Sequence, residues 1–305
     1  MARYVAGRVG QALVSLLVIA TLVFFLVRLT GDPVRLLLPD FAPPEFIAHL
    51  RQTMGLDRPI WEQYLGFLGQ LIRFDLGDSF NGQPVMDVLL DHLPATATLA
   101  VAALLVASLI AVPLGILSAV YKGSFVDTVA RTIALLGQSV PSFWLAIILI
   151  LVFGVALAWF PVAGRTGLSS YVLPAIAMGW AAVAGLVRIT RSSMLEVMDS
   201  DYIRMARAKG LPTRIVYVKH GLRNAIIPVL TFAGLLVGAF MNGSVVVENV
   251  FAWPGIGKAT LDAVKIRDFP VVQGAVILSA LFYISINLVV DLLYAVVDPR
   301  IRYRR

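Results

Sequence analysis

Few side chains in this sequence are suited to chemistry, and they are scattered along the chain. There is no cysteine, and the three histidines, His49, His92 and His220, lie far apart. No two histidines have the i,i+4 spacing with which one helix face holds a metal ion. The lack of cysteine excludes a thiolate nucleophile, a thiolate metal site and a disulfide framework. We therefore predict no catalytic residue and no metal site.

The stretch PGIGKAT, Pro254–Thr260, comes closest to a reactive motif, because its Gly-Lys pair suggests a phosphate-binding loop. That loop requires G-x-x-x-x-G-K-S/T between a strand and a helix. Here Ala252 takes the first glycine position and Ala259 takes the Ser/Thr position. We therefore predict that this chain has no ATP site. We expect Trp253–Gly255 to form a tight external turn with Trp253 at the membrane interface.

The composition is that of a membrane protein rather than an enzyme in solution. Of 305 residues, 59% are hydrophobic and 14% are charged, against roughly 25% charged in average globular proteins. Six apolar runs approach or exceed the ~20 residues that a helix needs to cross hydrocarbon. The fold class that follows is an all-α polytopic membrane protein with about six transmembrane helices. The predicted spans are Gln11–Val27, Leu99–Val120, Ile133–Phe160, Tyr171–Val187, Val229–Val247 and Val271–Val297.

These spans divide the chain into three parts. Residues 1–30 form the N-terminal tail and a first span that is not cleaved, since no A-x-A pattern follows it. Residues 31–95 form an external segment of short amphipathic helices, and residues 96–305 form the remaining transmembrane core. Lysine and arginine gather in the tails and in a loop at 191–228. The positive-inside rule places that loop and both termini in the cytoplasm.

The basic loop contains DYIRMARAKGLP, Asp201–Pro212, which is helix-prone and ends in a Gly-Leu-Pro stop. Drawn as a helix, Tyr202, Ala206 and Gly210 lie on one small apolar stripe with Ile203 beside them. Small residues allow another surface to come close, which suits docking into a groove on a separate protein. A basic helix of this kind could equally lie on anionic lipid. The residues alone leave both interpretations open.

The longer stretch DYIRMARAKGLPTRIVYVKHGLRNAIIP resembles the EAA loop of ATP-binding-cassette (ABC) importer permeases. In that match Gly210 takes the invariant glycine position and Ala206 the second alanine. Arg204 and Met205 stand where the general pattern has glutamate and the first alanine. The distance from Gly210 to the Ile-Ile-Pro at 226–228 is also longer. These departures resemble the dipeptide/oligopeptide branch, where ARAKGL followed by LRNA-IP is usual.

Other segments carry the same resemblance from end to end. They are LTGDP, GLDRPIWEQYLGFLGQLIRFDLGDS, PSFWLAIILI, SVVVENVFAWPGIGKATLDAVKIRDFPVVQG and DPRIR. The long external segment after the first span resembles that of the B-type subunit. The resemblance implies a type I importer permease, without enzyme activity of its own, that carries dipeptides or oligopeptides. Glutathione and nickel chelates are the solutes of other permeases in the same family.

The resemblance also implies the partners and the place of action. These are a second, C-type permease, two ATP-binding subunits or one fused ATPase chain, and an external solute-binding protein. The partner ATPase would bind ATP and Mg, with no cofactor in this chain and no nucleic acid. The site is the bilayer of the bacterial cytoplasmic (inner) membrane. Helix 201–211 would be the coupling helix, with ATPase contacts at Tyr202, Ile203, Arg204, Ala206, Arg207, Lys209, Gly210 and Leu211.

Polar residues in or beside the apolar runs are the candidates for a translocation path. They are Gln138, Ser139, Ser142, Asn242, Ser244, Glu248, Asn287 and Asp291. Each could instead make hydrogen bonds between helices. Asp291 carries two further alternatives, a salt bridge near the cytoplasmic end and proton coupling in a secondary transporter that works without an ATPase. The G-x-x-x-G at Gly234–Gly238 favours close helix packing, and its alternative role is to line the path with small residues that leave room for a solute.

Overall fold

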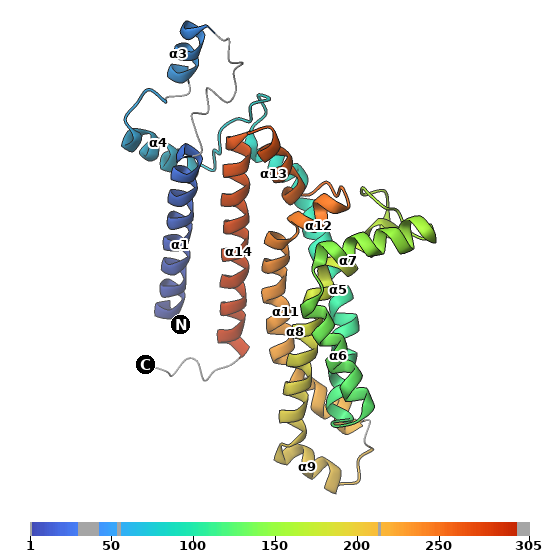
Figure 1. The fold of residues 1–305 in the computed structure, drawn as a ribbon. Helices are drawn as coiled ribbons and strands as arrows, with labels where there is room; N and C mark the ends of the chain where they lie inside the picture. Colours follow the sequence, from blue (N-terminus) through green and yellow to red (C-terminus); the bar gives the residue numbers. More distant parts are fainter. Residues whose placement is uncertain (1, 30–42, 54–55, 213–214, 298–305) are drawn as a thin grey trace. The chain divides into compact units, whose positions relative to one another are not determined.

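The computed structural model describes residues 2–29, 43–53, 56–212 and 215–297, and these are almost entirely helical (Figure 1). The chain divides into two compact units, one of residues 1–95 with 254–285 and one of residues 96–253 with 286–305. The α-helices are α1 (Ala2–Leu29), α3 (Pro44–Thr53), α4 (Ile60–Ile72), α5 (Val85–Val120), α6 (Phe125–Ser139), α7 (Ser142–Leu149), α8 (Val172–Met198), α9 (Asp201–Ala208), α11 (Arg223–Gly243), α12 (Val245–Val250), α13 (Ile256–Lys265) and α14 (Phe269–Val297).

The predicted fold class is confirmed. Within the described residues, five helices are long and apolar enough to cross a membrane, and a bent pair of helices would make a sixth span. The five lie in α1, α5, α8, α11 and α14, each over one of the predicted apolar runs. Two stretches of π-helix, Ile150–Ala156 after α7 and Val216–Leu222 before α11, lengthen neighbouring helices.

The prediction of one continuous third span over Ile133–Phe160 was wrong. The chain breaks between α6 and α7, whose axes differ by 102°. Pro141 causes the break, because proline lacks an N–H and forces the preceding residue out of the helical conformation. Val140 is accordingly extended, at φ −87° and ψ 117°. A new helix, α7, begins directly after Pro141.

The last third of the predicted external segment, residues 31–95, also differs from the prediction. Helices α3 and α4 match the predicted short amphipathic helices, but α5 begins at Val85 rather than at Leu99. His92 therefore lies inside a long helix, where its Nδ1 is 2.7 Å from the carbonyl oxygen of Val88. Hydropathy alone misses this early start, because polar residues such as Asp87 and Asp91 interrupt the apolar run.

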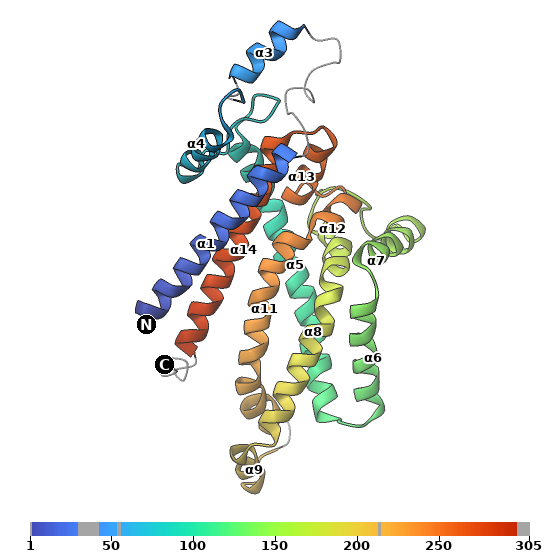
Figure 2. The same cartoon turned by 60° about the vertical axis from the view of Figure 1, so that its left-hand side comes forward.

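Helix α8 is the central packing element of the second unit, in contact with α6, α7 and α11 (Figure 2). Three glycines allow α5 and α11 to come close to α8. A Cβ on Gly179 would lie 2.6 Å from the carbonyl oxygen of Ala103 in α5, and one on Gly115 would lie 2.5 Å from Thr190 Cβ. Gly185 faces the ring of Phe232 in α11. The packing role of Gly234–Gly238 stays a prediction.

Replacing Gly179 by alanine is expected to destabilise the protein, because the backbone of α5 would have to move to admit the methyl group. Overpacking of this kind costs about 1–3 kcal/mol. Gly10→Ala in α1 is the matched control, since a Cβ there meets nothing within 4 Å. Thermal unfolding of both variants in detergent checks the expectation. Equal transition temperatures would show that α5 and α8 are not closely packed at this point.

Candidate functional site: helix α9 and its supports

Helix α9 begins after Ser200, which is extended (φ −73°, ψ 152°), and ends in a glycine cap. Gly210 lies in the left-handed region at φ +72°. Its N–H donates to the carbonyl of Arg207 at 2.9 Å, and the N–H of Leu211 donates to Ala206 at 3.4 Å. This pair of bonds is the Schellman arrangement, in which glycine is favoured because it has no Cβ to clash. The helix stop that the sequence predicts at Gly-Leu-Pro is confirmed.

One face of α9 packs against the chain itself. Ile203 is fully buried and Ala206 is 8% exposed, and both contact Val216 at the start of the π-helical turn. Of the four residues that the sequence placed on or beside one apolar stripe, Ile203 and Ala206 therefore face the chain itself, whereas Tyr202 and Gly210 are exposed. A helix with small apolar residues on one side looks the same in sequence whether that side meets its own chain or a partner.

The other face of α9 is exposed. Met205 has 61% of its surface exposed, and Tyr202 and Leu211 are also exposed. Four of the predicted contact residues are exposed as well: Arg204, Arg207, Lys209 and Gly210. Met205 was absent from the predicted contacts, because the sequence did not show which face of the helix packs against the chain.

Two polar contacts fix α9 further. Asn224 in α11 donates from Nδ2 to the hydroxyl of Tyr202 at 2.9 Å. The guanidinium of Arg207 lies 5.7 Å from the centre of the Tyr217 ring. Because these contacts join α9 to α11 and to the turn before it, α9 is held on the chain on two sides.

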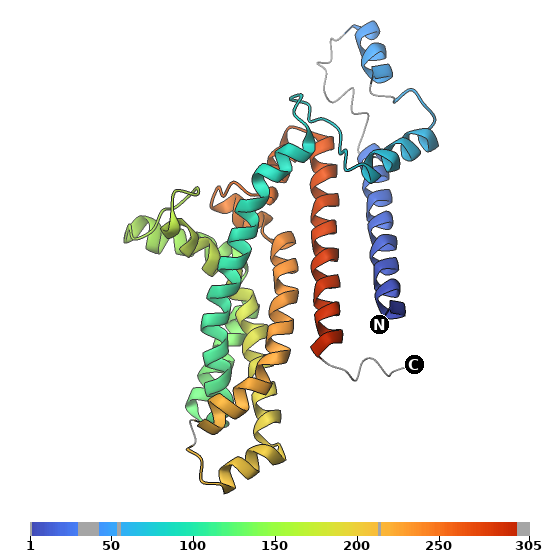
Figure 3. The same cartoon turned by 180° about the vertical axis from the view of Figure 1, so that it is seen from behind.

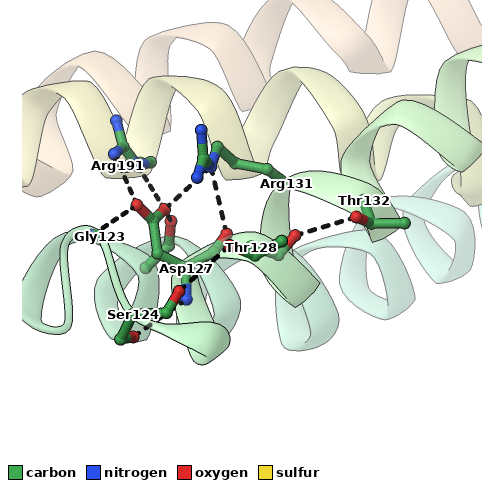
Figure 4. A network of polar contacts seen from close by, with 8 residues as sticks. Gly123, Ser124, Asp127, Thr128, Arg131, Thr132 and Arg191 are labelled. Carbon is green, nitrogen blue, oxygen red and sulfur yellow. Dashed lines mark hydrogen bonds and ion pairs between the residues drawn. The ribbon is translucent and has the colours of Figure 1, made fainter.

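A buried ion pair joins α8, the helix that precedes α9, to α6 (Figure 4). Arg191 of α8 donates to both carboxylate oxygens of Asp127 in α6, from Nε at 3.0 Å and from Nη2 at 3.1 Å. Ser118 of α5 donates to the same carboxylate at 2.6 Å, and the N–H of Gly123 donates at 2.9 Å. Asp127 is only 1% exposed. Its carboxylate therefore joins α5, the turn after it, α6 and α8 at one point.

The predicted path residues whose side chains the structure describes fall in three places. Gln138 and Ser139 end α6 and Ser142 begins α7, so all three lie at the bend rather than inside a straight span. Asn287 is half-buried in α14. The side chains of Asn242 and Asp291 lie outside the described residues.

Ser244 and Glu248 form a second group of predicted path residues that lie close together. Both are fully buried, one turn apart at the start of α12. Glu248 accepts a hydrogen bond of 2.7 Å from the Thr96 hydroxyl in α5. Among the described residues, the Ser244 hydroxyl has no hydrogen-bond partner. The bond between Thr96 and Glu248 is the interhelical bond that the sequence left as an alternative to a path-lining role.

The turn after α12 corrects another prediction. The chain does turn at Ala252, which has φ +46°. Trp253, however, is fully buried, and its ring meets that of Tyr171 edge to face with the centroids 4.6 Å apart. Because Tyr171 stands directly before α8, the tryptophan anchors this turn to that helix, and its buried side chain offers no surface to lipid.

The loop helix α13 carries its own charge pairs. Asp262 accepts hydrogen bonds from Lys258 and from Lys265, and these two ammonium groups hold the pKa of Asp262 below its usual value. A lowered carboxyl pKa gives a stabilisation that is complete above the ordinary value of ~4 and is lost as the pH falls below it. The contribution is small because Asp262 is well exposed to solvent.

The comparisons with known proteins agree over the whole chain. Residues 111–303 match the family model described as "Binding-protein-dependent transport system inner membrane component". Residues 1–100 match the model described as "Binding-prot-dependent transport system membrane comp, N-term". Together the two models cover nearly the full sequence, including the segment after the first span.

Two relatives are similar over almost their full lengths. A Brucella abortus (strain 2308) protein, named as a peptide transport system permease, is 42% identical over 99% of this chain and 100% of its own. The glutathione transport system permease protein GsiC of Escherichia coli (strain K12) is 40% identical over 100% of both chains.

A solved structure shows the same fold. A crystal structure described as an amino acid ABC transporter with histidines matches with a TM-score of 0.52 at 15% identity. It covers 70% of this chain and 94% of its own. The resemblance that the EAA-like loop indicated is confirmed: the chain belongs to the family of inner-membrane permease subunits of binding-protein-dependent ABC importers, in the dipeptide/oligopeptide-like branch.

Proposed function

We propose that this chain forms one half of the translocation path of a peptide importer, and that α9 is the surface on which a separate ATPase subunit acts. The observation that carries the proposal is the two-sided character of α9. Its inner face is locked on the chain by Ile203 and Ala206, whereas its outer face offers Met205 between basic residues. An exposed apolar side chain ringed by charge is typical of a protein interface.

The supports of α9 explain how a force on this short helix would reach the spans. Ile203 and Tyr202 join α9 to the start of α11, and α8 runs directly into α9. The Asp127–Arg191 pair then fixes α8 to α6. A displacement of α9 would therefore move α6, α8 and α11 together, as a lever between two states of the permease.

The proposed assembly contains a C-type permease, two ATP-binding subunits or one fused chain, and an external binding protein. The partners would bind ATP and Mg and would carry out hydrolysis, while this chain acts only as the permease. In this arrangement α9 and both termini lie in the cytoplasm, where the positive-inside rule puts the basic loops. A peptide solute is supported by the name of the Brucella abortus relative, and the name of the Escherichia coli relative supports glutathione as the alternative solute.

Purification through a tag on this chain tests the assembly. ATP-binding subunits are expected to co-purify, and the reconstituted complex is expected to hydrolyse ATP faster when the external binding protein and a dipeptide are present. Purification of this chain alone, with solute uptake in the absence of any ATPase, would refute the importer assignment.

The same preparation shows which of the candidate solutes the importer carries. If ATPase activity responds to glutathione or to a nickel chelate and not to dipeptides or longer peptides, the peptide assignment is wrong and the importer assignment stands. The comparison requires binding protein from the same system, because the solute in this class is selected mainly by that partner.

A further inference from the structure

The unit formed by residues 1–95 and 254–285 contains an apolar cavity of about 440 Å³. Its walls come from the middle of α1, the end of α4 and the middle of α14, and every residue that lines it is apolar. Leu16 and Leu17 lie midway along the candidate span Val5–Leu29, and Leu278 lies midway along Phe269–Val289. The cavity is therefore at the depth of the hydrocarbon, where lipid tails and not water meet the protein.

The end of helix α4 lines this cavity, and α4 crosses the end of α1 (Figure 3). It is held there by the Tyr64 hydroxyl, 2.7 Å from that of Thr21, and by Gln63, which accepts from Arg28 at 3.1 Å. None of its residues is buried, and the apolar side chains of Trp61 and Leu65, which do not line the cavity, are exposed. An amphipathic helix of this kind lies in the membrane interface, with its apolar face among the acyl chains.

The turn after α4 holds an unusual residue at the mouth of the cavity. Phe74 has φ +57° and occupies the position of the Schellman motif where glycine is favoured. Both bonds of the motif are formed, from Phe74 N–H to Leu71 at 3.0 Å and from Asp75 N–H to Gln70 at 3.0 Å. A bulky side chain in this conformation is strained. Phe74 is nevertheless 67% exposed while it lines the cavity, so the protein alone gives it little apolar contact.

Arg73 stands between two residues that line the cavity, Ile72 and Phe74. Its side chain is exposed, and among the described residues no hydrogen bond or ion pair engages its guanidinium. A guanidinium at the edge of an apolar pocket complements a ligand with a phosphate group joined to a hydrocarbon tail.

We propose that this cavity binds one acyl chain of a bilayer glycerophospholipid, and that Arg73 pairs with the phosphodiester of the same molecule. The tail fills the space between α1 and α14 under α4 and contacts the ring of Phe74. The bound lipid thereby joins α4, which has no buried residue of its own, to the two spans. The assignment is independent of the transported solute and of the ATPase.

The test uses the assembled importer in vesicles of phosphatidylglycerol that contain a small fraction of phosphatidylglycerol with a photoreactive diazirine in its tail. After illumination, mass spectrometry of the digested chain is expected to find the label on residues that line the cavity. Leu281→Trp, which fills the space, is expected to lower this labelling by about fivefold or more, since a filled pocket admits no chain. Leu109→Trp, on an exposed part of α5, is the control and should label as the wild type does.

Two further variants separate lipid binding from a structural role. Arg73→Gln should lower the labelling and Arg73→Lys should restore part of it, because the lysine keeps the charge without the planar fork. Phe74→Gly should relieve the strained turn, so unfolding should not become easier, yet labelling should fall. Labelling that is spread evenly over α1 and α14 and unchanged by these substitutions would overturn the proposal. Cross-links from this cavity to the second permease subunit would also overturn it, because protein and not lipid would then fill the space.

Discussion

Met205→Glu is expected to lower ATP-driven uptake by about tenfold or more while the permease still inserts and assembles with its partner permease. Met205 is the most exposed apolar side chain on α9 and does not belong to the buried cluster of Ile203, Ala206 and Val216 that holds the helix on its own chain. A charge placed in the desolvated centre of an interface costs at least the ~1.4 kcal/mol that corresponds to a factor of ten. Uptake and ATPase activity of the reconstituted importer are the two measurements.

The matched control for this variant is Ile203→Ala. Ile203 is fully buried against Val216, so its truncation should loosen α9 and lower thermal stability, whereas Met205→Glu should leave stability unchanged. Ala206→Arg is a poor probe for the same reason, because Ala206 faces the chain itself. Full uptake and full stimulation of ATPase activity with glutamate at position 205 would show that the outer face of α9 is not a contact surface.

Arg191→Ala is expected to give the second large effect, on stability as well as on transport. It would leave the Asp127 carboxylate buried with only Ser118, the Gly123 N–H and the longer contact to Arg131 at 3.4 Å. Breaking a buried pair by removing one partner costs about 3–5 kcal/mol. In a protein of this size each kilocalorie lowers the transition temperature by about 2–4 °C. Thermal unfolding in detergent measures the change directly.

Lys265→Ala provides the comparison, because it removes one member of an exposed pair with Asp262. Exposed pairs contribute at most about 1 kcal/mol, so the control should unfold close to the wild-type temperature. Arg191→Lys keeps a charge but loses the two-point contact and should fall between the two. If Arg191→Ala and Lys265→Ala unfold at the same temperature, the Asp127 network does not hold α6 to α8.

Hydropathy predicted the membrane spans well because crossing a bilayer demands long apolar helices whatever their neighbours are. It could not predict the bend at Pro141. Proline is tolerated inside many membrane helices, and Pro113 in the middle of α5 leaves that helix unbroken. Whether a proline breaks a span depends on the packing around it, which the sequence of one segment does not contain.

In the candidate site, too, local features were predictable and contacts between distant segments were not. The helix stop at Gly-Leu-Pro is a local property and was predictable, whereas the orientation of Ile203 and Ala206 depends on Val216, which lies across the loop. Asp127 and Arg191 lie outside the predicted spans, in two different stretches between them, and nothing in either stretch indicates that they pair. Trp253 was placed at an interface on the basis of residue type alone, and its partner Tyr171 lies far away in sequence.

A single cysteine at position 205 provides the most direct test of the claim that the ATP-binding subunit contacts the permease at α9. The chain has no natural cysteine, so Met205→Cys carries the only thiol of this subunit. A photoreactive maleimide attached there should cross-link to an ATP-binding subunit, and the same label at Leu109→Cys on α5 should not. Cross-links from position 205 to phospholipid alone, in a complex that still transports solute, would contradict the account.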